Sequence, residues 1–400
     1  MTTARRLLLS LALLGGLSTS VAFAQPSCGS GTGVSRVTWK GWDFCVTRMA
    51  NTTPQPNGSG MEISQVHFKG RLFLKRANIP VLNVKYATGG CGCYRDWFDA
   101  ERAFSCGPVD KWVDGSNKPG FCPGTTTGVQ TVCDHPGTDA GSWTGVAAED
   151  KGTHLKLTQQ ATAGWYRYIP VWEFYLNGTM RAGMDFAATT SSCVQSTHHH
   201  HAYWRMDFDV EGPLNDFVDY YYHDPASSSW GTATRILTET HWIDSNGGGA
   251  LPTAGRSHWR LGSVGSPMKV DVIRQAVDET ANLDDAYDDG ITGDFPTFDG
   301  ALLAYDANQM TDTASQGLSD CPIQLSSYDN DTDVDDADVV LWVHSGVRHV
   351  AEGTSTSHSC FSSGPKIKVS VPDTPVDFDG NHISNVVLYR DGAWLEFPVP

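Results

Sequence analysis

The sequence predicts an all-β protein built as a large β-sandwich. Many short runs rich in Val, Ile, Tyr, Phe and Trp are separated by Gly, Pro, Asn and Asp, which is the pattern of strands joined by turns. The chain also holds 13 tryptophans and 41 glycines, and no segment carries a convincing helical period. A chain of 400 residues with this pattern is long enough to bury the core between two packed sheets.

The first 24 residues have the form of a secretory signal peptide. Arg5 and Arg6 precede the apolar run Leu7 to Leu14, and small residues precede a cleavage site near Ala24. The apolar run is too short for a permanent membrane anchor. We therefore expect an exported protein, secreted or periplasmic, and the arginine pair also permits a twin-arginine route.

The mature chain is expected to form one domain after a short lead-in. Residues 25–36 are small and polar, and residues 37–400 contain no repeat or long linker. All ten cysteines follow the signal, which indicates structural disulfides in an oxidising compartment, with Cys106, Cys122 and Cys133 holding a turn-rich region. Cleavage removes two arginines and no acids, so the net charge changes from −17 to −19, which argues against nucleic acid and anionic membranes as partners.

Strand signals recur along the chain, and one hairpin is especially clear. Asn177-Gly178 separates a strand that ends at Leu176 from a return strand through Met184. The acidic, turn-rich residues 278–336 are expected to be surface loops. The other clear strands are Val37–Trp39, Val66–Lys69, Val81–Tyr86, Gly164–Leu176 and Asp338–Val343.

The run from Thr197 to Val210 is the most informative segment, because it reads as one strand that contains four consecutive histidines. Strand alternation places His198 and His200 on the apolar face, with the intervening residues on a polar face. Buried imidazoles need partners, and two of them at i and i+2 suit Cu or Zn. The alternative is a chance polar tract, like an expression tag, but this tract is internal and lies within a patterned strand.

These residues resemble the catalytic domain of the copper-containing, quinone-dependent amine oxidases, from about Trp39 to His349. His198-His199-His200 stands before Arg205-Met206-Asp207 as the family's His-x-His motif does. The family's third copper ligand follows a strand similar to Asp338–Trp342, which implies His349, with His344 as the competing candidate. The resemblance thus implies copper bound by His198, His200 and His349.

The family's topaquinone cofactor is made from a tyrosine in a motif that Thr162–Tyr168 resembles, which implies Tyr166 as the precursor. Two residues depart from the motif: Trp165 stands in place of Asn, and Arg167 in place of an acid. Strand alternation predicts that both side chains face away from Tyr166. The alternative role for Tyr166 is an ordinary core tyrosine.

Two further motifs imply catalytic residues and a disulfide. Val84-Lys85-Tyr86 and Phe98-Asp99-Ala100-Glu101 resemble elements that imply Asp99 as the general base and Tyr86 as the hydroxyl bonded to the cofactor oxygen. Trp97 would line the substrate entrance, and Asp99 has the alternative role of a turn or capping residue. A further motif implies that Cys133 pairs with an upstream cysteine such as Cys122.

The resemblance also implies a site for a second cation, and the acidic residues that would form it are all present. Asp207, Asp209 and Asp338 match the family's peripheral ligands, with carbonyl oxygens from Phe208 and Val339. Hard oxygen ligands suit Ca²⁺. A solvated acidic face is the alternative.

The implied function is oxidation of a primary amine by O₂ to an aldehyde, with release of ammonia and hydrogen peroxide, by a homodimeric exported enzyme. Two other functions fit the same residues: a non-catalytic relative that keeps copper and binds partners, and a copper-only oxidase without a quinone. A secreted sandwich with no site is the least consistent with the sequence, because it would leave His198 and His200 without partners on an apolar face.

Overall fold

The computed structural model describes residues 25–29, 33–49, 60–87, 91, 93–96, 100–106, 128–135, 137–139, 141–189, 191–221, 223–224, 229–242, 258–274, 300–307, 329–349, 360–371, 385–390 and 393–398. The chain divides into two compact units, one formed by residues 25–371 and the other by residues 1–24 and 372–400. The expected signal peptide lies outside the described residues. No helix among the described residues is long and apolar enough to cross a membrane.

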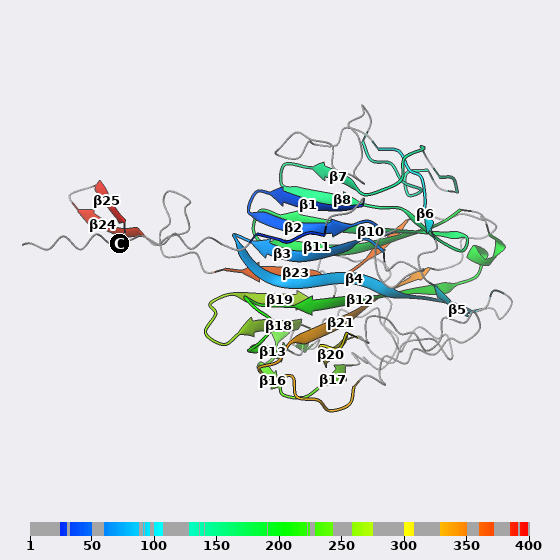
Figure 1. Ribbon diagram of the computed structural model, residues 1–400. Helices are drawn as coiled ribbons and strands as arrows, with labels where there is room; N and C mark the ends of the chain where they lie inside the picture. The colour runs from blue at the N-terminus through cyan, green and yellow to red at the C-terminus, as the bar shows by residue number, and fades with distance from the viewer. Residues whose placement is uncertain are drawn as a thin grey trace, which may run out of the picture. The chain divides into compact units, whose positions relative to one another are not determined.

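The first sheet of the large unit is antiparallel and contains the histidine strand at its centre. Its strand order is β1-β2-β3-β4-β12-β21-β20-β17, with β5 paired to β4 (Figure 1). Its strands are β1 (Val34–Trp39), β2 (Trp42–Thr47), β3 (Glu62–Phe68), β4 (Arg71–Tyr86), β5 (Cys93–Asp96), β12 (His198–Phe208), β17 (Thr240–Trp242), β20 (Gly300–Ala304) and β21 (Val339–His349).

The second sheet is also antiparallel and contains the strand that carries Tyr166. Its order is β16-β13-β18-β19-β23-β11-β10-β8-β7, with β22 paired to β11 and β9 paired to both β10 and β6. Its strands are β6 (Ala100–Glu101), β7 (Ala147–Asp150), β8 (His154–Thr158), β9 (Ala161–Ala163), β10 (Tyr166–Tyr175), β11 (Thr179–Ala188), β13 (Asp216–Tyr221), β16 (Thr234–Ile236), β18 (His258–Ser263), β19 (Lys269–Ile273), β22 (Phe361–Ser363) and β23 (Lys366–Ser370).

The remaining elements are small. A 3₁₀ turn, η2 (Ser192–Gln195), precedes β12, and β14 (His223–Asp224) pairs with β15 (Ser229–Trp230). In the other compact unit, β24 (Asn385–Arg390) and β25 (Ala393–Pro398) form a hairpin. The predicted all-β class is confirmed. The first strand, β1, begins at Val34, within the expected lead-in, and the larger compact unit comprises residues 25–371.

Aromatic side chains from the facing surfaces of the two sheets form the core of the sandwich. Phe174 of β10 stacks on Phe44 of β2 at 4.2 Å between ring centroids and meets the edge of Trp42 at 5.2 Å. Further along, Trp172 and Trp204 are both fully buried and lie 5.3 Å apart. Large aromatic rings buried from both sides supply much of the hydrophobic stabilisation that holds the sheets together.

The predicted hairpin at Asn177-Gly178 is confirmed, with β10 and β11 in register from Phe174↔Met180 to Tyr166↔Ala188. Gly178 has a φ of +80°, and a Cβ there would come within 2.6 Å of a carbonyl oxygen of β23. Glycine is therefore required both by the turn and by the close approach. The return strand runs four residues beyond the predicted end at Met184.

Strand β12 pairs along its whole length with β21, and along most of it with β4. All eleven of its residues are buried, so the expected polar face is not solvated. Side chains from other elements cover this outer face: Arg274 hydrogen-bonds to His344 of β21, and Tyr305 lies over the Arg205 guanidinium. Strand alternation separated the two faces correctly but could not show that both are covered.

Two further differences from the prediction concern β21 and β20. β21 continues past Val343 to His349, because its register with β12 extends to the pair His198↔His349. Residues 300–304 form the buried strand β20 within a region expected to be surface loops.

The described disulfides join Cys28 to Cys45, Cys91 to Cys193 and Cys133 to Cys360. The predicted pairing of Cys133 with an upstream cysteine is wrong, because its partner comes from the segment that leads into β22, the neighbour of β11. Cys106 is also disulfide-bonded. Cys122 lies outside the described residues.

Candidate metal and cofactor site

The register of the first sheet brings three predicted site residues into one row. His198 begins β12 opposite Tyr86 on β4 and opposite His349 on β21. Directly opposed residues in antiparallel strands point to the same face, so all three side chains lie on the inner face of the sheet. The Tyr86 and His198 rings are 4.8 Å apart, and all three residues are at most 3% exposed.

The hydrogen bonds of His198 set its tautomer. Its Nδ1 lies 2.7 Å from the Ser196 carbonyl oxygen, which can only accept, so Nδ1 carries the proton and Nε2 the lone pair. That Nε2 faces His349 Nδ1 at 3.2 Å and is hydrogen-bonded by the Tyr166 hydroxyl from the opposite sheet. A carbonyl that fixes Nδ1–H while Nε2 points inward is the arrangement typical of a metal-binding histidine.

Tyr168 gives His200 a similar partner. The Tyr168 hydroxyl lies 3.2 Å from His200 Nδ1, and Tyr166 meets the same imidazole edge-on at 4.4 Å. Two tyrosines at i and i+2 on β10 thus face two histidines at i and i+2 on β12. Sequence reasoning assigned no role to Tyr168, although this matched spacing was visible in the sequence.

His349, rather than His344, lies at His198. Burial lowers the pKa of His349 to about 4, so its imidazole is neutral near pH 7 and retains a lone pair. His344 is on the outer face of the same sheet, where its Nε2 lies 2.9 Å from His201 Nδ1. Of the two histidines that the sequence left open as the third ligand, His349 is the one that lies beside His198.

The residues fit a metal ion in their chemistry but not fully in their placement. Two nitrogens bound to one tetrahedral ion at about 2.0–2.1 Å lie about 3.3 Å apart, close to the 3.2 Å between His198 Nε2 and His349 Nδ1. The three imidazoles, however, are not close enough together: no choice of one ring nitrogen from each places all three nitrogens within 4.8 Å of one another. Among the described residues, three carboxylates do meet that condition. Binding by all three histidines therefore requires at least one ring to move.

The two departures from the family motif occupy different surroundings. Arg167 is buried and forms two bonds to the Asp139 carboxylate, at 2.6 and 2.9 Å, so its charge is compensated. Trp165 does not face away from the site: its indole N–H donates to the Tyr86 hydroxyl at 3.1 Å. The prediction for Trp165 is wrong because β10 begins at Tyr166, and alternation does not extend into the preceding turn.

Trp97 and Asp99, predicted as the entrance residue and the general base, lie outside the described residues.

The acids predicted to hold a second cation do come together. One carboxylate oxygen from each of Asp207, Asp209 and Asp338 lies within 4.8 Å of the others. Burial and the neighbouring carboxylates raise the pKa of Asp207 to about 7 and that of Asp338 to about 6. Phe208 and Val339, the predicted carbonyl donors, are directly paired residues of β12 and β21 beside this cluster.

Two nearby residues complete the electrostatics of this acidic cluster. Lys75 forms an ion pair with Asp209 at 3.1 Å. Asp216 is fully buried, and this burial, together with repulsion from Asp209 and Asp338, raises its pKa to about 8. A hydrogen bond from the Val210 N–H to its carboxylate acts in the opposite direction. Sequence reasoning missed Asp216, because it lies beyond the end of β12 and only the return of the chain into β13 brings it back.

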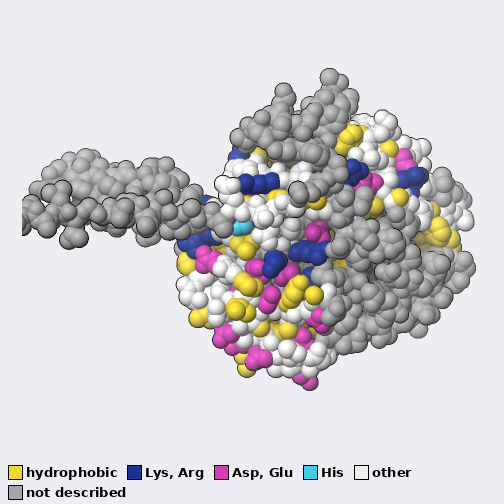
Figure 2. Space-filling model, viewed as in Figure 1, with side chains coloured by type: hydrophobic (Ala, Val, Ile, Leu, Met, Phe, Trp, Pro, Cys, Tyr) yellow, Lys and Arg dark blue, Asp and Glu magenta, His cyan; other side chains and the backbone are white. Residues whose placement is uncertain are grey.

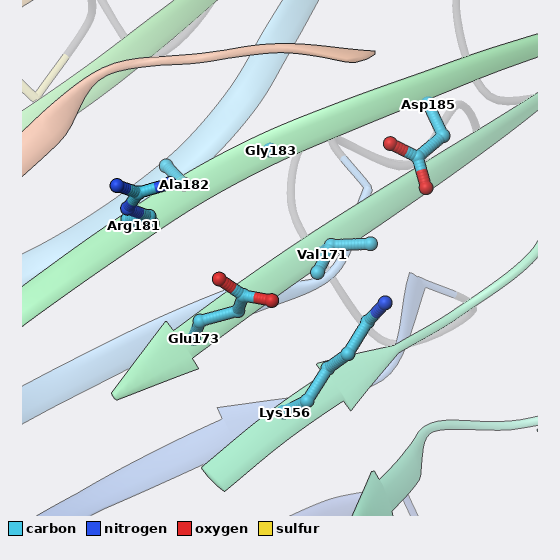
Figure 3. A pocket seen from close by; sticks show the side chains of 7 residues that line it. All are labelled: Lys156, Val171, Glu173, Arg181, Ala182, Gly183 and Asp185. Carbon is cyan, nitrogen blue, oxygen red and sulfur yellow. The ribbon is translucent and has the colours of Figure 1, made fainter. Parts of the chain in front are cut away.

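A cavity of about 210 Å³ lies elsewhere, on strands β8, β10 and β11. Figure 3 shows the charged ends of Lys156, Glu173 and Asp185 around Val171 and the bare backbone of Gly183. Glu173 already accepts a hydrogen bond from the Tyr175 hydroxyl. The cavity is smaller and more polar than a typical small-molecule site, and its residues differ from those of the histidine site.

The surface in view carries charges of both signs. Figure 2 shows Lys and Arg side chains interspersed with Asp and Glu over the described part of that face. Among the described residues, Arg36 pairs with Asp43 and Arg71 with Glu211, both at 2.5 Å. Exposed pairs of this kind contribute little stability.

Comparison with known structures shows that the sandwich has the fold of the copper-containing amine oxidases. No protein-family model matches the chain, and no curated protein matches it. A copper-containing benzylamine oxidase from Hansenula polymorpha matches 85% of this chain at a TM-score of 0.55 and 13% identity. An amine oxidase from Aspergillus nidulans matches 98% of it at 0.54 and 15%.

A lysyl oxidase from Pichia pastoris matches 91% of the chain at a TM-score of 0.52 and 12% identity. The matched regions span 61%, 59% and 56% of those three proteins, so the chain covers about three fifths of their length. Similarity at this level of identity establishes the fold alone.

Proposed function

We propose that the protein is a copper- and quinone-dependent oxidase of primary amines, with Tyr166 as the cofactor precursor. The observation that carries the proposal is the hydrogen bond between the Tyr166 hydroxyl and His198 Nε2, the nitrogen that also faces His349. A buried tyrosine that is hydrogen-bonded to a histidine whose free nitrogen is oriented as in metal sites is suited to a modification that depends on metal and O₂.

His198, His200 and His349 would hold the copper, which suits imidazole donors. A topaquinone made from Tyr166 would supply an electrophilic carbonyl and an electron sink for amine oxidation by O₂, which amino-acid side chains cannot supply unaided. The described residues orient the groups of the site and exclude water from it: Tyr166, Tyr168 and His200 are at most 2% exposed. Exclusion of water strengthens each polar contact around the reacting group.

Tyr86 would hydrogen-bond the cofactor oxygen, and Asp99 would remove the α-proton of the bound amine. The position of Tyr86 against His198 supports its role. The role of Asp99 rests on its motif alone. A general base must lie within hydrogen-bond reach of the proton that it takes, so Asp99 is the residue that mutagenesis needs to test first after Tyr166.

The acidic cluster would bind calcium through Asp207, Asp209 and Asp338, with carbonyl oxygens from Phe208 and Val339. Mutual repulsion among buried carboxylates supports this role, because a divalent cation relieves it. Calcium at this position would stabilise the C-terminal end of β12, whereas His198 lies at its N-terminal end. Export to the periplasm or outside the cell and assembly as a homodimer complete the proposal, and the described disulfides are consistent with export.

The test is quinone formation after Cu²⁺ is added to the metal-free protein in air. Redox-cycling staining and titration with phenylhydrazine should both report a quinone in the native chain and none in Tyr166→Phe. Tyr168→Phe is the matched control, since it removes a neighbouring phenol that also contacts the histidines.

Tight copper binding without quinone would overturn the proposal. Copper-dependent O₂ consumption would then indicate a copper-only oxidase, and its absence a non-catalytic copper protein.

A further inference from the structure

We propose that Trp165 is a positioning residue that orients the Tyr86 hydroxyl beside the cofactor tyrosine. The expected effect of Trp165 on quinone formation rests on the proposed function, whereas its contact with Tyr86 does not. Trp165 immediately precedes Tyr166, in the position where the related oxidases have Asn. The structure gives this residue a specific partner rather than an outward orientation.

The contact between Trp165 and Tyr86 has a defined direction. The indole Nε1–H can only donate, so the Tyr86 oxygen is the acceptor at 3.1 Å. The two rings are 6.3 Å apart and inclined at 52°, which leaves the N–H aimed at the hydroxyl rather than stacked on the ring. One lone pair of Tyr86 is thereby occupied, and its own proton must be donated in another direction.

The turn before β10 holds Trp165 firmly enough to act in this way. The Trp165 carbonyl oxygen accepts from both the Thr189 N–H at 3.1 Å and the Thr189 hydroxyl at 2.9 Å. Gly164, with a φ of +55°, allows the chain to turn directly before it. The indole is partly buried and packs against the main core. Its donor is therefore fixed by backbone and packing together.

The bond joins two sheets at the site. Tyr86 ends β4 in the first sheet, and Trp165 leads into β10 in the second. Because Tyr166 is the next residue, the bond sets the Tyr86 hydroxyl relative to the backbone from which the Tyr166 ring projects. The Tyr86 ring also lies 4.8 Å from His198, the residue that Tyr166 contacts. A Tyr86 hydroxyl without this bond would be free to rotate and would not hold its proton in one fixed direction.

The experiment removes the donor atom and keeps the shape. Trp165 is replaced by β-(3-benzothienyl)alanine, in which sulfur takes the place of the indole N–H, and separately by Phe. Tyrosine ring carbons are labelled with ¹³C at Cζ, and the Tyr86 resonance is assigned by its loss in Tyr86→Phe. Loss of the N–H should shift that resonance in the metal-free protein. It should also slow quinone formation about tenfold, the factor expected for one hydrogen bond.

The same analogue at Trp143, which packs on Phe104 away from the site, is the control and should change neither readout. An unchanged Tyr86 resonance in both Trp165 variants would overturn the inference, as would a shifted resonance with an unchanged rate of quinone formation. If the native chain forms no quinone, the proposed function fails, and the resonance alone decides whether Trp165 positions Tyr86.

Discussion

The two faces of β12 carry the same histidine content in different surroundings. The inner face presents His198 and His200 beside His349 of β21, and the outer face presents His199 and His201 with His344 of the same partner strand. All six imidazoles are at most 1% exposed. Histidine spacing, count and burial therefore do not distinguish the faces.

The groups that surround the imidazoles do distinguish them. The inner set is contacted by the phenols of Tyr166 and Tyr168. On the outer face the buried Arg274 guanidinium donates to His344, at 3.2 Å to Nδ1 and at 3.0 Å to its carbonyl oxygen. A permanent positive charge at this distance disfavours a divalent cation.

Opposite tautomers follow from these contacts. His198 donates through Nδ1 and keeps the lone pair of Nε2, whereas His344 accepts at Nδ1 and must donate through Nε2 to His201. On the inner face His198 thus keeps the lone pair of Nε2 directed into the site, whereas on the outer face His344 and His201 continue a hydrogen-bond chain from Arg274. A His-x-His pattern needs its neighbours before it can be read as a metal site.

The largest expected effect separates the faces by copper affinity. His198→Gln should weaken copper binding more than a hundredfold, because it removes a ligand rather than one of the outer partners that cost about 10–100-fold. His201→Gln, three residues along on the opposite face, should change it less than about threefold. Competition titration against a chelator measures both. Equal losses in the two variants would show that the faces are not distinct.

The second prediction attempts to convert the outer face. Arg274→Met leaves the His344 carbonyl oxygen and Nδ1 without these bonds, and should lower the free energy of unfolding by about 3 kcal/mol. It should also let the outer histidines take up a second equivalent of Cu²⁺. Denaturant unfolding and metal analysis test the two parts. A stable variant that still binds one equivalent would contradict the electrostatic account.

The third prediction concerns the acidic cluster at the other end of β12. The pKa values of Asp216, Asp207 and Asp338 are about 8, 7 and 6, against about 3.9 in an unfolded chain. Between about pH 4 and pH 8 the folded state therefore holds protons that the unfolded state has lost, so stability without metal should fall as pH rises.

Added Ca²⁺ should raise the melting temperature more at pH 8 than at pH 5, where protons occupy the same carboxylates. Calorimetry at the two pH values measures this difference, and Asp207→Asn should reduce it. A larger effect of Ca²⁺ at pH 5 would be the opposite of what a proton-competitive site requires.

The smallest expected effect concerns Lys75, whose ammonium bonds Asp209 at 3.1 Å. Lys75→Met removes a cation from the cluster and should increase calcium affinity about threefold to tenfold, a modest factor because the lysine side chain is 42% exposed. Arg71→Met is the matched control, since that cation lies on the same strand but pairs with Glu211. Isothermal titration calorimetry compares them, and weaker binding in Lys75→Met would show that the lysine supports the site.

Short-range patterns in the sequence predicted most of the local structure. Alternation identified β12 and its inner histidines, and Asn177-Gly178 identified the β10–β11 hairpin, because both depend on neighbouring residues. The burial of the outer face of β12 was not predictable in this way, because it depends on residues such as Arg274 that approach from distant segments.

The errors have the same origin. Cys133 pairs with Cys360 across 227 residues, whereas the resemblance implied an upstream partner such as Cys122. The orientation of Trp165 depends on where β10 begins, and strand boundaries are poorly defined by sequence. Asp216 reaches the acidic cluster only through the tertiary fold.

The disulfide between Cys91 and Cys193 makes assembly of the histidine site depend on the cellular compartment in which the chain folds. Cys91 lies five residues after Tyr86 and Cys193 five residues before His198, so the bond closes the ends of β4 and β12 where these two residues meet. In the chain-entropy model, a loop of this length accounts for about 4.7 kcal/mol of stabilisation. A chain kept in a reducing cytoplasm lacks that closure. We therefore expect maturation to follow an order in which thiol oxidation precedes metal loading, and recombinant protein made without oxidation to take up copper incompletely.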